Sequence, residues 1–320
     1  MIRTDLAIEM HEYLTETAQE ISGADVSESE KNDIKITTIK IETDEASASL
    51  GKPKGNYITI EMPDILTSEK EEYEKMCQAV AEELRGLLPL KKDDTVLVVG
   101  LGNWNITPDS LGPDVISKLM VTRHLFTYIP DQISDNLRSV SAISPGVLGI
   151  TGMETGEIIK GVCEKIKPAC VIAIDALASR SLDRISRTVQ LCDTGISPGA
   201  GVGNKRKELS VNTLGVPVIA IGVPTVIDAQ TIAKDRFSES IRNVMKKTDN
   251  NTEKYKALYS FIESGEENLS SYIPENMAGF IVTPKDVDSM IDKTAKILAN
   301  GINLALHENI TLDDVEAFIG

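Results

Sequence analysis

Residues 96–113 read Val96-Leu97-Val98-Val99-Gly100-Leu101-Gly102-Asn103-Trp104-Asn105-Ile106-Thr107-Pro108-Asp109-Ser110-Leu111-Gly112-Pro113. The apolar run at the start is typical of a buried parallel strand, and open α/β sheets bind ligands beyond the carboxyl ends of such strands. Gly100 and Gly102 allow the backbone to turn sharply and a ligand to approach closely. Asp109 follows Pro108, so we expect its carboxylate at the start of a helix, beside the predicted crevice.

The glycine loop matches neither common nucleotide-binding motif. A dinucleotide fingerprint needs a third glycine three residues after the second, where this chain has Asn105. A P-loop needs Gly-Lys-Ser/Thr after four spacer residues, and neither this loop nor the later glycine cluster has it. We therefore expect the loop to present the side chain of Asp109 rather than to bind phosphate.

A second apolar run, residues 169–174, ends in another aspartate, Asp175. Aspartates at the ends of neighbouring parallel strands can face one crevice. A close pair titrates as a unit, and one member is easily kept protonated. Such a pair supplies a general base and a general acid without a cofactor. The structural alternative is that each aspartate only caps a helix or a turn.

Several long motifs, in the same order along essentially the whole chain, resemble the germination proteases, the spore endopeptidases of spore-forming Gram-positive bacteria. They occupy residues 3–7, 100–113, 144–147, 174–178, 193–204 and 221–226. Two aspartates are catalytic in this family, and the resemblance places them at Asp109 and Asp175. It also implies an α/β fold with a mostly parallel central sheet flanked by helices, similar to the hydrogenase-maturation endopeptidases, and no metal or other cofactor.

The resemblance further implies substrates and processing. Substrates would be the small acid-soluble proteins that coat spore DNA, cut after an acidic residue during germination, in the cytoplasm of the forespore and in the spore core. The protein would be a homotetramer, made as a zymogen that removes its own short pro-segment. We expect residues 1–5 to be this pro-segment, cut between Asp5 and Leu6, and residues 6–320 to be one α/β peptidase domain with a helical C-terminal part.

Composition excludes several other classes of protein. A net charge of −16 and an aromatic content of 4% argue against a nucleic-acid partner. No stretch approaches the roughly 18 apolar residues of a membrane span, and the N-terminus lacks an apolar signal core, so we expect an intracellular protein without membrane contact. The four cysteines form no Cys-x-x-Cys motif, and His11, His124 and His307 lie in no motif. A cysteine protease or a zinc site is therefore not expected.

Periodicity predicts the surrounding elements. Helices are expected over residues 6–21, 69–88 and 154–166, strands over residues 34–41, 57–62, 139–143, 188–192 and 216–222, and a loop over residues 46–56. Beyond Val226 the pattern is largely helical. The alternation of strands and helices between residues 95 and 225 predicts a parallel core sheet.

Asp193-Thr194-Gly195 is the local mark of pepsin-like aspartic proteases, which need two such loops in an all-β fold. This chain has one, within an α/β pattern, so we expect Asp193 to cap or turn the chain. The glycine-rich loop that follows is expected to line the crevice. The residues predicted to contact the substrate peptide are Gly102, Asn103, Trp104, Gly199, Gly201 and Gly203. For Trp104, the alternative to substrate contact is a position in the hydrophobic core.

Two aspartates would hydrolyse a peptide bond in opposite protonation states. The ionised one takes a proton from water while the protonated one hydrogen-bonds the scissile carbonyl, and backbone N–H groups of the glycine loop help the oxyanion. The sequence does not assign which aspartate is the base. One alternative is a nickel-dependent maturation endopeptidase, which needs two carboxylates and a histidine. The other is a non-catalytic binding module on an α/β scaffold.

Overall fold

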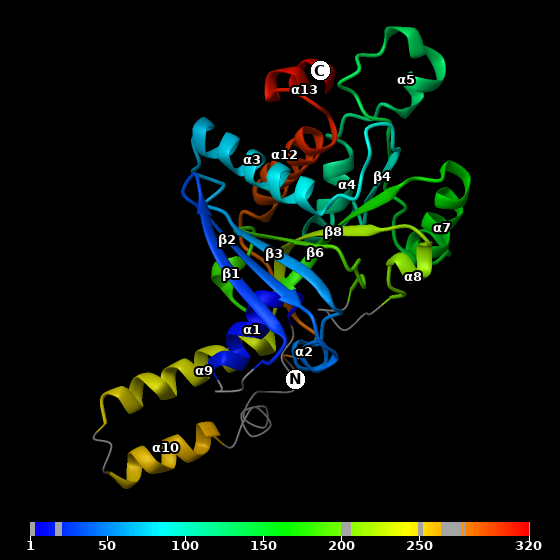
Figure 1. Ribbon diagram of the computed structural model, residues 1–320. Coiled ribbons are helices and arrows are strands. Elements are labelled where there is room, and N and C mark those ends of the chain that lie inside the picture. Colours follow the sequence, from blue (N-terminus) through cyan, green and yellow to red (C-terminus); the bar gives the residue numbers. More distant parts are fainter. Residues whose placement is uncertain are drawn as a thin grey trace.

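The computed structural model describes residues 4–16, 21–199, 206–248, 252–263, 277 and 279–319. Within these residues a mixed sheet forms the centre of the molecule, with strand order β1-β2-β3-β7-β8-β6-β4-β5 and a short β9 beside β8 (Figure 1). The strands are β1 (Ala24–Lys31), β2 (Ile34–Ile41), β3 (Gly55–Glu61), β4 (Val96–Gly100), β5 (Val140–Ile143), β6 (Cys170–Ser179), β7 (Thr188–Cys192), β8 (Val218–Asp228) and β9 (Ile281–Val282).

Four neighbouring strands, β5, β4, β6 and β8, run parallel. Every residue of β4 is buried, as expected of a strand covered by helices on both faces. The chain passes from β4 to β5 on one side and then to β6 on the other, so the strand order reverses between β4 and β6. Ligands of open α/β sheets bind at such a point. The parallel core predicted between residues 95 and 225 is confirmed.

The prediction of a mostly parallel sheet is wrong, because five of the eight strand pairs described are antiparallel. β1, β2 and β3 form a meander that joins the core through β7. Asn32 and Asp33, between β1 and β2, have φ angles of 52° and 66°, as in the two-residue turns that suit hairpins. β1 lies outside the predicted strands because seven of its eight residues are exposed, which leaves no alternating apolar pattern.

Helices cover both faces of this sheet (Figure 1). They are α1 (Ala7–Glu16), α2 (Asp44–Leu50), α3 (Lys70–Leu87), α4 (Leu111–Ile116), α5 (Arg123–Tyr128), α6 (Leu148–Thr151), α7 (Thr155–Ile166), α8 (Val211–Leu214), α9 (Ala229–Lys246), α10 (Glu253–Glu263), α12 (Val287–Leu306) and α13 (Leu312–Ile319), with short 3₁₀ turns η1 (Thr107–Asp109), η2 (Pro130–Gln132) and η3 (Leu182–Arg184). α3, α4 and α12 pack on one face of the sheet. On the other face, α1 and α2 cover β2, β3 and β7, and α7 and α8 cover β4 and β6.

The helical character expected beyond Val226 is confirmed by α9, α10, α12 and α13. α12 is buried along much of its length against α3. α9 instead buries only Ala229 and Thr231, in its first turn, and Figure 1 shows α9 and α10 extending away from the sheet.

Two predicted boundaries differ from the structure. The loop expected over residues 46–56 contains most of α2, which is capped by Thr43 Oγ1 accepting from the Ala46 N–H at 3.1 Å. The strand expected to end at Asp175 continues to Ser179, because β8 pairs with it as far as Ile227. Asp175 therefore lies within β6 rather than at its end.

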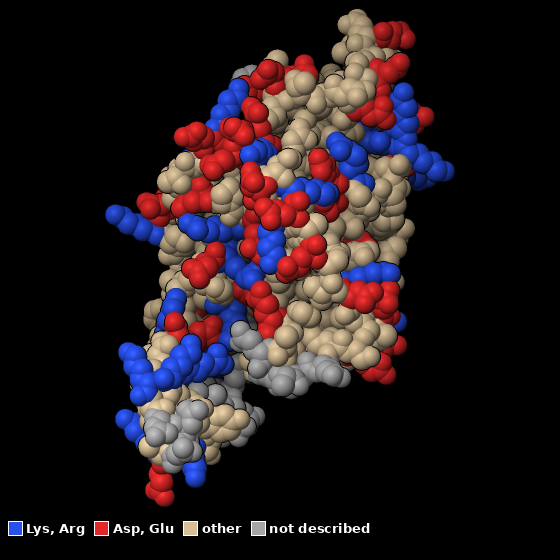
Figure 2. Space-filling view, turned by 60° about the vertical axis from the view of Figure 1, so that its left-hand side comes forward, with Lys and Arg blue, Asp and Glu red and all other residues tan. Residues whose placement is uncertain are grey.

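Acidic and basic side chains are interspersed over the face of the molecule shown in Figure 2. In the part of the chain that the structure describes, no helix combines the length and the apolar character needed to cross a bilayer.

Candidate active site

The loop after β4 folds back on itself and fixes Asp109. β4 ends at Gly100, and Gly102 takes a φ of 111°, which glycine adopts without steric cost. The Asn103 N–H donates to the Asp109 carbonyl at 2.9 Å, and the Asp109 N–H donates to the Ile106 carbonyl at 2.8 Å. A Cβ atom on residue 102 would lie 2.0 Å from the Asp109 carbonyl oxygen, so this closed loop requires glycine there.

The short turn that carries Asp109 is also tied to the sheet. Thr225, on β8, donates its hydroxyl to the Pro108 carbonyl at 2.7 Å. Asp109 is the last residue of η1, and α4 begins at Leu111. The predicted position of Asp109 at a helix start is therefore confirmed to within two residues, and the contacts with β8 and Asn103 hold it there.

Asp175 lies on the neighbouring strand, one residue beyond the last pair between β4 and β6. Its surface is 5% exposed, and its Oδ1 accepts the Ala176 N–H at 3.0 Å. Asp109, Asp175 and Asp5 line one cleft of about 680 Å³. The structure thus brings together the two aspartates predicted to be catalytic, in a cleft of the size that peptide-like ligands occupy.

The two carboxyls differ in how strongly they hold a proton. Burial raises the pKa of Asp109 to about 6, against an opposing hydrogen bond from the backbone of Asn103. Burial also raises the pKa of Asp175 well above its ordinary value, and the negative charges of Asp109 and Asp5 raise it further. A pair of acids in such unequal surroundings can hold one proton between them, which suits general acid–base chemistry.

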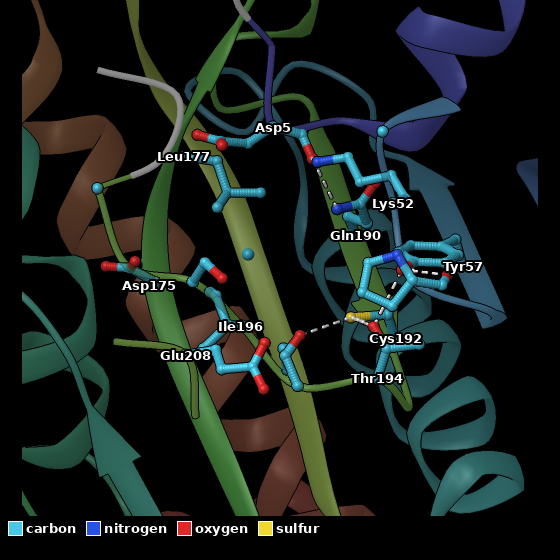
Figure 3. Close-up of a pocket in the computed structure, with 17 residues that line it drawn as sticks. Asp5, Lys52, Tyr57, Asp175, Leu177, Gln190, Cys192, Thr194, Ile196 and Glu208 are labelled. Carbon is cyan, nitrogen blue, oxygen red and sulfur yellow. Dashed lines mark hydrogen bonds between the residues drawn. The ribbon is translucent and has the colours of Figure 1, made fainter. Parts of the chain in front are cut away.

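The N-terminal segment enters the same cleft. The Asp5 N–H donates to the Ala178 carbonyl, and the Ala178 N–H donates to the Asp5 carboxylate, both at 2.9 Å. The Asp5 carbonyl accepts from Lys52 Nζ at 2.8 Å and from Gln190 Nε2 at 3.2 Å (Figure 3). Leu6, the next residue, is fully buried. The bond predicted to be cleaved, between Asp5 and Leu6, is therefore held at the cleft with its carbonyl directed to Lys52 and Gln190.

The residues predicted to contact the substrate are only partly gathered here. Those that line the cleft are Gly102, Asn103 and Gly199. Trp104 is not among the lining residues, and 48% of its surface is exposed, so it does not belong to the core either. Gly201 and Gly203 lie outside the described residues.

Asp193 has a structural role, but it holds two strands together rather than capping or turning its own chain. Its carboxylate accepts from the backbone N–H of Asn56 at 2.8 Å and from the side-chain amide of Asn56 at 2.6 Å. Asn56 belongs to β3, and Asp193 follows β7, so these bonds fasten the beginning of one strand to the end of the next. Asp193 is not among the residues that line the cleft with Asp109.

Four residues that lie in no sequence motif either hold Asp5 from a neighbouring pocket or line the cleft itself. Lys52 and Gln190 hold Asp5, and burial lowers the pKa of the Lys52 ammonium although the charge of Asp5 opposes this. Arg206 and Lys207 line the cleft, and both side chains remain in contact with solvent. Only the packing of distant segments places these residues together, so no local pattern could have identified them.

The three histidines are all described, and none lines the cleft. His307 is buried, and its Nδ1 accepts the Arg138 N–H at 3.0 Å. Among the residues that the structure describes, no group of three or more His, Cys, Asp or Glu side chains is placed to hold a metal ion. The set of two carboxylates and a histidine that a nickel-dependent endopeptidase needs is therefore not formed around Asp109 and Asp175.

Comparison with known proteins gives concordant matches over the whole chain. A family model described as germination protease matches residues 2–277 and 267–319. A germination protease of Clostridium tetani is 48% identical over 320 residues, which are 99% of each chain. One of Caldanaerobacter subterraneus is 50% identical over 318 residues, which are 97% of this chain and 95% of the relative. One of Bacillus licheniformis is 44% identical over 351 aligned positions, which cover 98% of this chain and 95% of the relative.

Proposed function

The chain belongs to the germination protease family, and we propose that it cleaves peptide bonds with Asp109 and Asp175 as its two catalytic carboxyls. It is a peptide-bond hydrolase of spore germination, as membership of this family shows. The observation that carries the two-aspartate assignment is geometric: both side chains line one cleft beside neighbouring parallel strands. The raised pKa of each carboxyl supports the same assignment.

We assign Asp109 as the base and Asp175 as the acid. Asp175 is nearly fully buried and faces two other carboxylates, so it keeps its proton when Asp109 is ionised. Asp109 takes a proton from the attacking water, while the Asp175 carboxyl hydrogen-bonds the scissile carbonyl and supports the oxyanion. Asp109 then gives its proton to the departing amine. The Asn103 N–H already donates to the Asp109 carbonyl, so the oxyanion is assigned to Asp175 instead.

The pH dependence of kcat/KM follows from this assignment. We expect kcat/KM to rise with pH through about 6, as Asp109 loses its proton and becomes a base. At higher pH it falls again, as Asp175 loses the proton that it must donate. The measurement is the initial rate on a peptide whose own groups do not titrate near pH 6. An acid limb centred near the ordinary carboxyl value of about 4 would contradict Asp109 as the base.

We propose small acid-soluble spore proteins as the substrates, cut after an acidic residue. Lys207 lines the cleft and would attract an acidic side chain beside the cut, whereas Arg206, which also lines it, already faces Glu154 at 3.9 Å. The test is incubation of the full chain with such a protein, with and without excess chelator, followed by mass mapping of the fragments. We expect a few cuts, each after an acidic residue, at equal rates in both samples. Loss of cutting in chelator would favour the metal-dependent maturation endopeptidase, and intact substrate in both samples would favour a binding module.

We also propose that residues 1–5 are a pro-segment that the protein removes by cutting between Asp5 and Leu6, and that it assembles as a homotetramer in the forespore. The contacts of Asp5 with Ala178, Lys52 and Gln190 support a segment that occupies the cleft before processing. Because the Asp5 carbonyl is engaged by Lys52 and Gln190, these two hydrogen bonds have to break before the bond reaches the aspartates.

A further inference from the structure

One edge of β6 is open where the strand passes the two aspartates. Pairing with β4 ends at Gly100 and Ile174, whereas pairing with β8 continues to Ser179. Within the described part of the chain, no strand pairs with residues 175–179 of β6 on the β4 side. This short edge, which includes Asp175, Ala176 and Ala178, lines the cleft that also contains Asp109.

The backbone groups on this edge can be assigned from the hydrogen bonds around it. The Ile174 carbonyl accepts the Leu101 N–H at 2.8 Å, so Ile174 presents its backbone groups to the β4 side. Because backbone groups alternate between the two sides of a strand, Ala176 and Ala178 present theirs to the same side. Both backbone groups of Ala178 bond to Asp5, which lines the same cleft: the Asp5 N–H donates to the Ala178 carbonyl and the Ala178 N–H donates to the Asp5 carboxylate, each at 2.9 Å.

We propose that this edge binds the substrate, as an extended peptide that pairs with Ala176 and Ala178 like an added strand. The inference rests on the proposed function and names how the same cleft holds its substrate. Strand addition satisfies the backbone groups of an edge whatever the side chains of the peptide are, and it fixes the peptide along the strand. A peptide paired here lies alongside Asp175 and faces the loop that carries Asp109.

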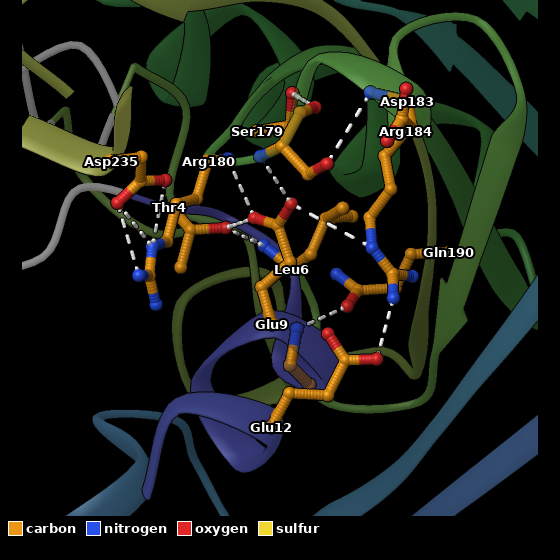
Figure 4. Close-up of polar contacts among 12 residues, drawn as sticks. Thr4, Leu6, Glu9, Glu12, Ser179, Arg180, Asp183, Arg184, Gln190 and Asp235 are labelled. Carbon is orange, nitrogen blue, oxygen red and sulfur yellow. Dashed lines mark hydrogen bonds and ion pairs between the residues drawn. The ribbon is translucent and has the colours of Figure 1, made fainter. Parts of the chain in front are cut away.

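Asp5 already occupies one end of this edge in the manner proposed for the substrate. It pairs through its own N–H with the Ala178 carbonyl, and its carboxylate takes the place of a peptide carbonyl at the Ala178 N–H. Glu9 reinforces this position, because its carboxylate accepts the backbone N–H groups of Arg180 at 2.7 Å and Ser181 at 2.8 Å (Figure 4). In the unprocessed chain, a substrate that pairs with Ala178 must therefore displace Asp5, whereas removal of residues 1–5 frees this position.

Pairing at Ala176 would also act on the acid of the proposed mechanism. The Ala176 N–H donates to Asp175 Oδ1 at 3.0 Å, and this hydrogen bond lowers the pKa of Asp175 against the effects of burial and charge. A peptide carbonyl that takes over the Ala176 N–H removes this bond. Asp175 is then more firmly protonated, which is the state needed to hydrogen-bond the scissile carbonyl.

The decisive experiment is an N-methyl scan of a peptide that spans one mapped cut. Methylation removes one N–H at a time, and in a paired strand only alternate N–H groups face the partner. We expect kcat/KM to fall by about tenfold or more at every second position and to change little at the positions between. The same series is measured for binding to the Asp109→Asn variant of the full chain, so that recognition is tested whether or not the peptide is cut.

The outcomes separate this inference from the proposed function. If the unaltered protein binds the unmodified peptide but does not cut it, the proposed function is wrong. The binding measurements on the methylated peptides then still test whether the substrate pairs with the edge of β6. If the losses of kcat/KM and of binding do not alternate from one methylated position to the next, the substrate does not pair with the edge of β6, and the proposed function is unaffected. As a second readout, Asp5→Ala is made in the Asp109→Asn variant, which cannot remove residues 1–5, and is expected to tighten peptide binding roughly threefold, because the peptide no longer competes with Asp5 for Ala178. Asp25→Ala in the same variant, on the exposed β1, is the matched control and leaves peptide binding unchanged.

Discussion

Asp109→Asn and Asp175→Asn are each expected to reduce kcat/KM for spore-protein cleavage by at least about 1,000-fold. Asparagine keeps the shape of the side chain but can neither take a proton from water nor give one to the scissile carbonyl. The proposed mechanism uses the two carboxyls in opposite protonation states, so the loss of either one removes the reaction. Initial rates on a mapped peptide, at the pH optimum of the unaltered protein, measure the effect.

The melting temperature separates loss of chemistry from loss of fold. The pKa of Asp175 is raised in the folded state, so its ionisation costs stability as the pH rises through that pKa. Asparagine carries no such cost, and Asp175→Asn is expected to melt at the same temperature as the unaltered protein or higher at neutral pH. An inactive variant with a normal melting transition therefore identifies a catalytic carboxyl.

Asp193→Asn is the matched control, because it makes the same chemical change outside the cleft. The substitution places an amide beside the side-chain amide of Asn56 and weakens the hydrogen bonds that connect β3 and β7. We expect the free energy of unfolding to fall by about 1–3 kcal/mol. We expect a lower melting temperature and activity within about threefold of the unaltered protein. An inactive Asp193→Asn beside an active Asp109→Asn would show that the catalytic aspartates are assigned wrongly.

Gly102→Ala is expected to lower kcat by about 100-fold or more without removing either carboxyl, because small displacements of a catalytic group are costly. The added Cβ would lie 2.0 Å from the Asp109 carbonyl oxygen, and the φ of 111° is one that alanine rarely adopts. The loop must open, which breaks the bond from the Asn103 N–H to the Asp109 carbonyl and moves the base. Steady-state rates at saturating peptide report the change in kcat directly.

Gly161→Ala is the control for the substitution itself. Gly161 lies in α7, and a Cβ there would meet nothing within 4 Å. Alanine favours helix by about 1 kcal/mol over glycine, so this variant should melt slightly higher and keep full activity. Normal turnover by Gly102→Ala would mean that the closed loop does not position Asp109.

The sequence was sufficient to place Asp109 and Asp175 at one cleft, because Asp109 lies in the loop after the apolar run that forms β4 and Asp175 directly follows the apolar run that begins β6. The extension of β6 past Asp175 was not predictable, because it depends on pairing with β8, which lies more than 40 residues further along the chain. Lys52 and Gln190 were not predictable either, since their meeting with Asp5 depends on how α1 and the loop after α2 pack against β7. The parallel core follows from the alternation of strands and helices, whereas the antiparallel pairing of β7 with β3 and β8 depends on contacts between segments that are distant in sequence.

The meander strand β1 has a consequence for colloidal behaviour. A protein that binds unfolded segments as added strands is at risk of capturing the strands of its own copies. β1 is at the outer end of the sheet, and its side chains include those of Asp25, Glu28 and Glu30. When two copies approach edge to edge, these acids repel one another, and such charges are how natural sheets prevent aggregation. The strand edge beside Asp175 can stay open because it lies inside a cleft, while the acidic side chains of β1 protect the outer edge formed by that strand.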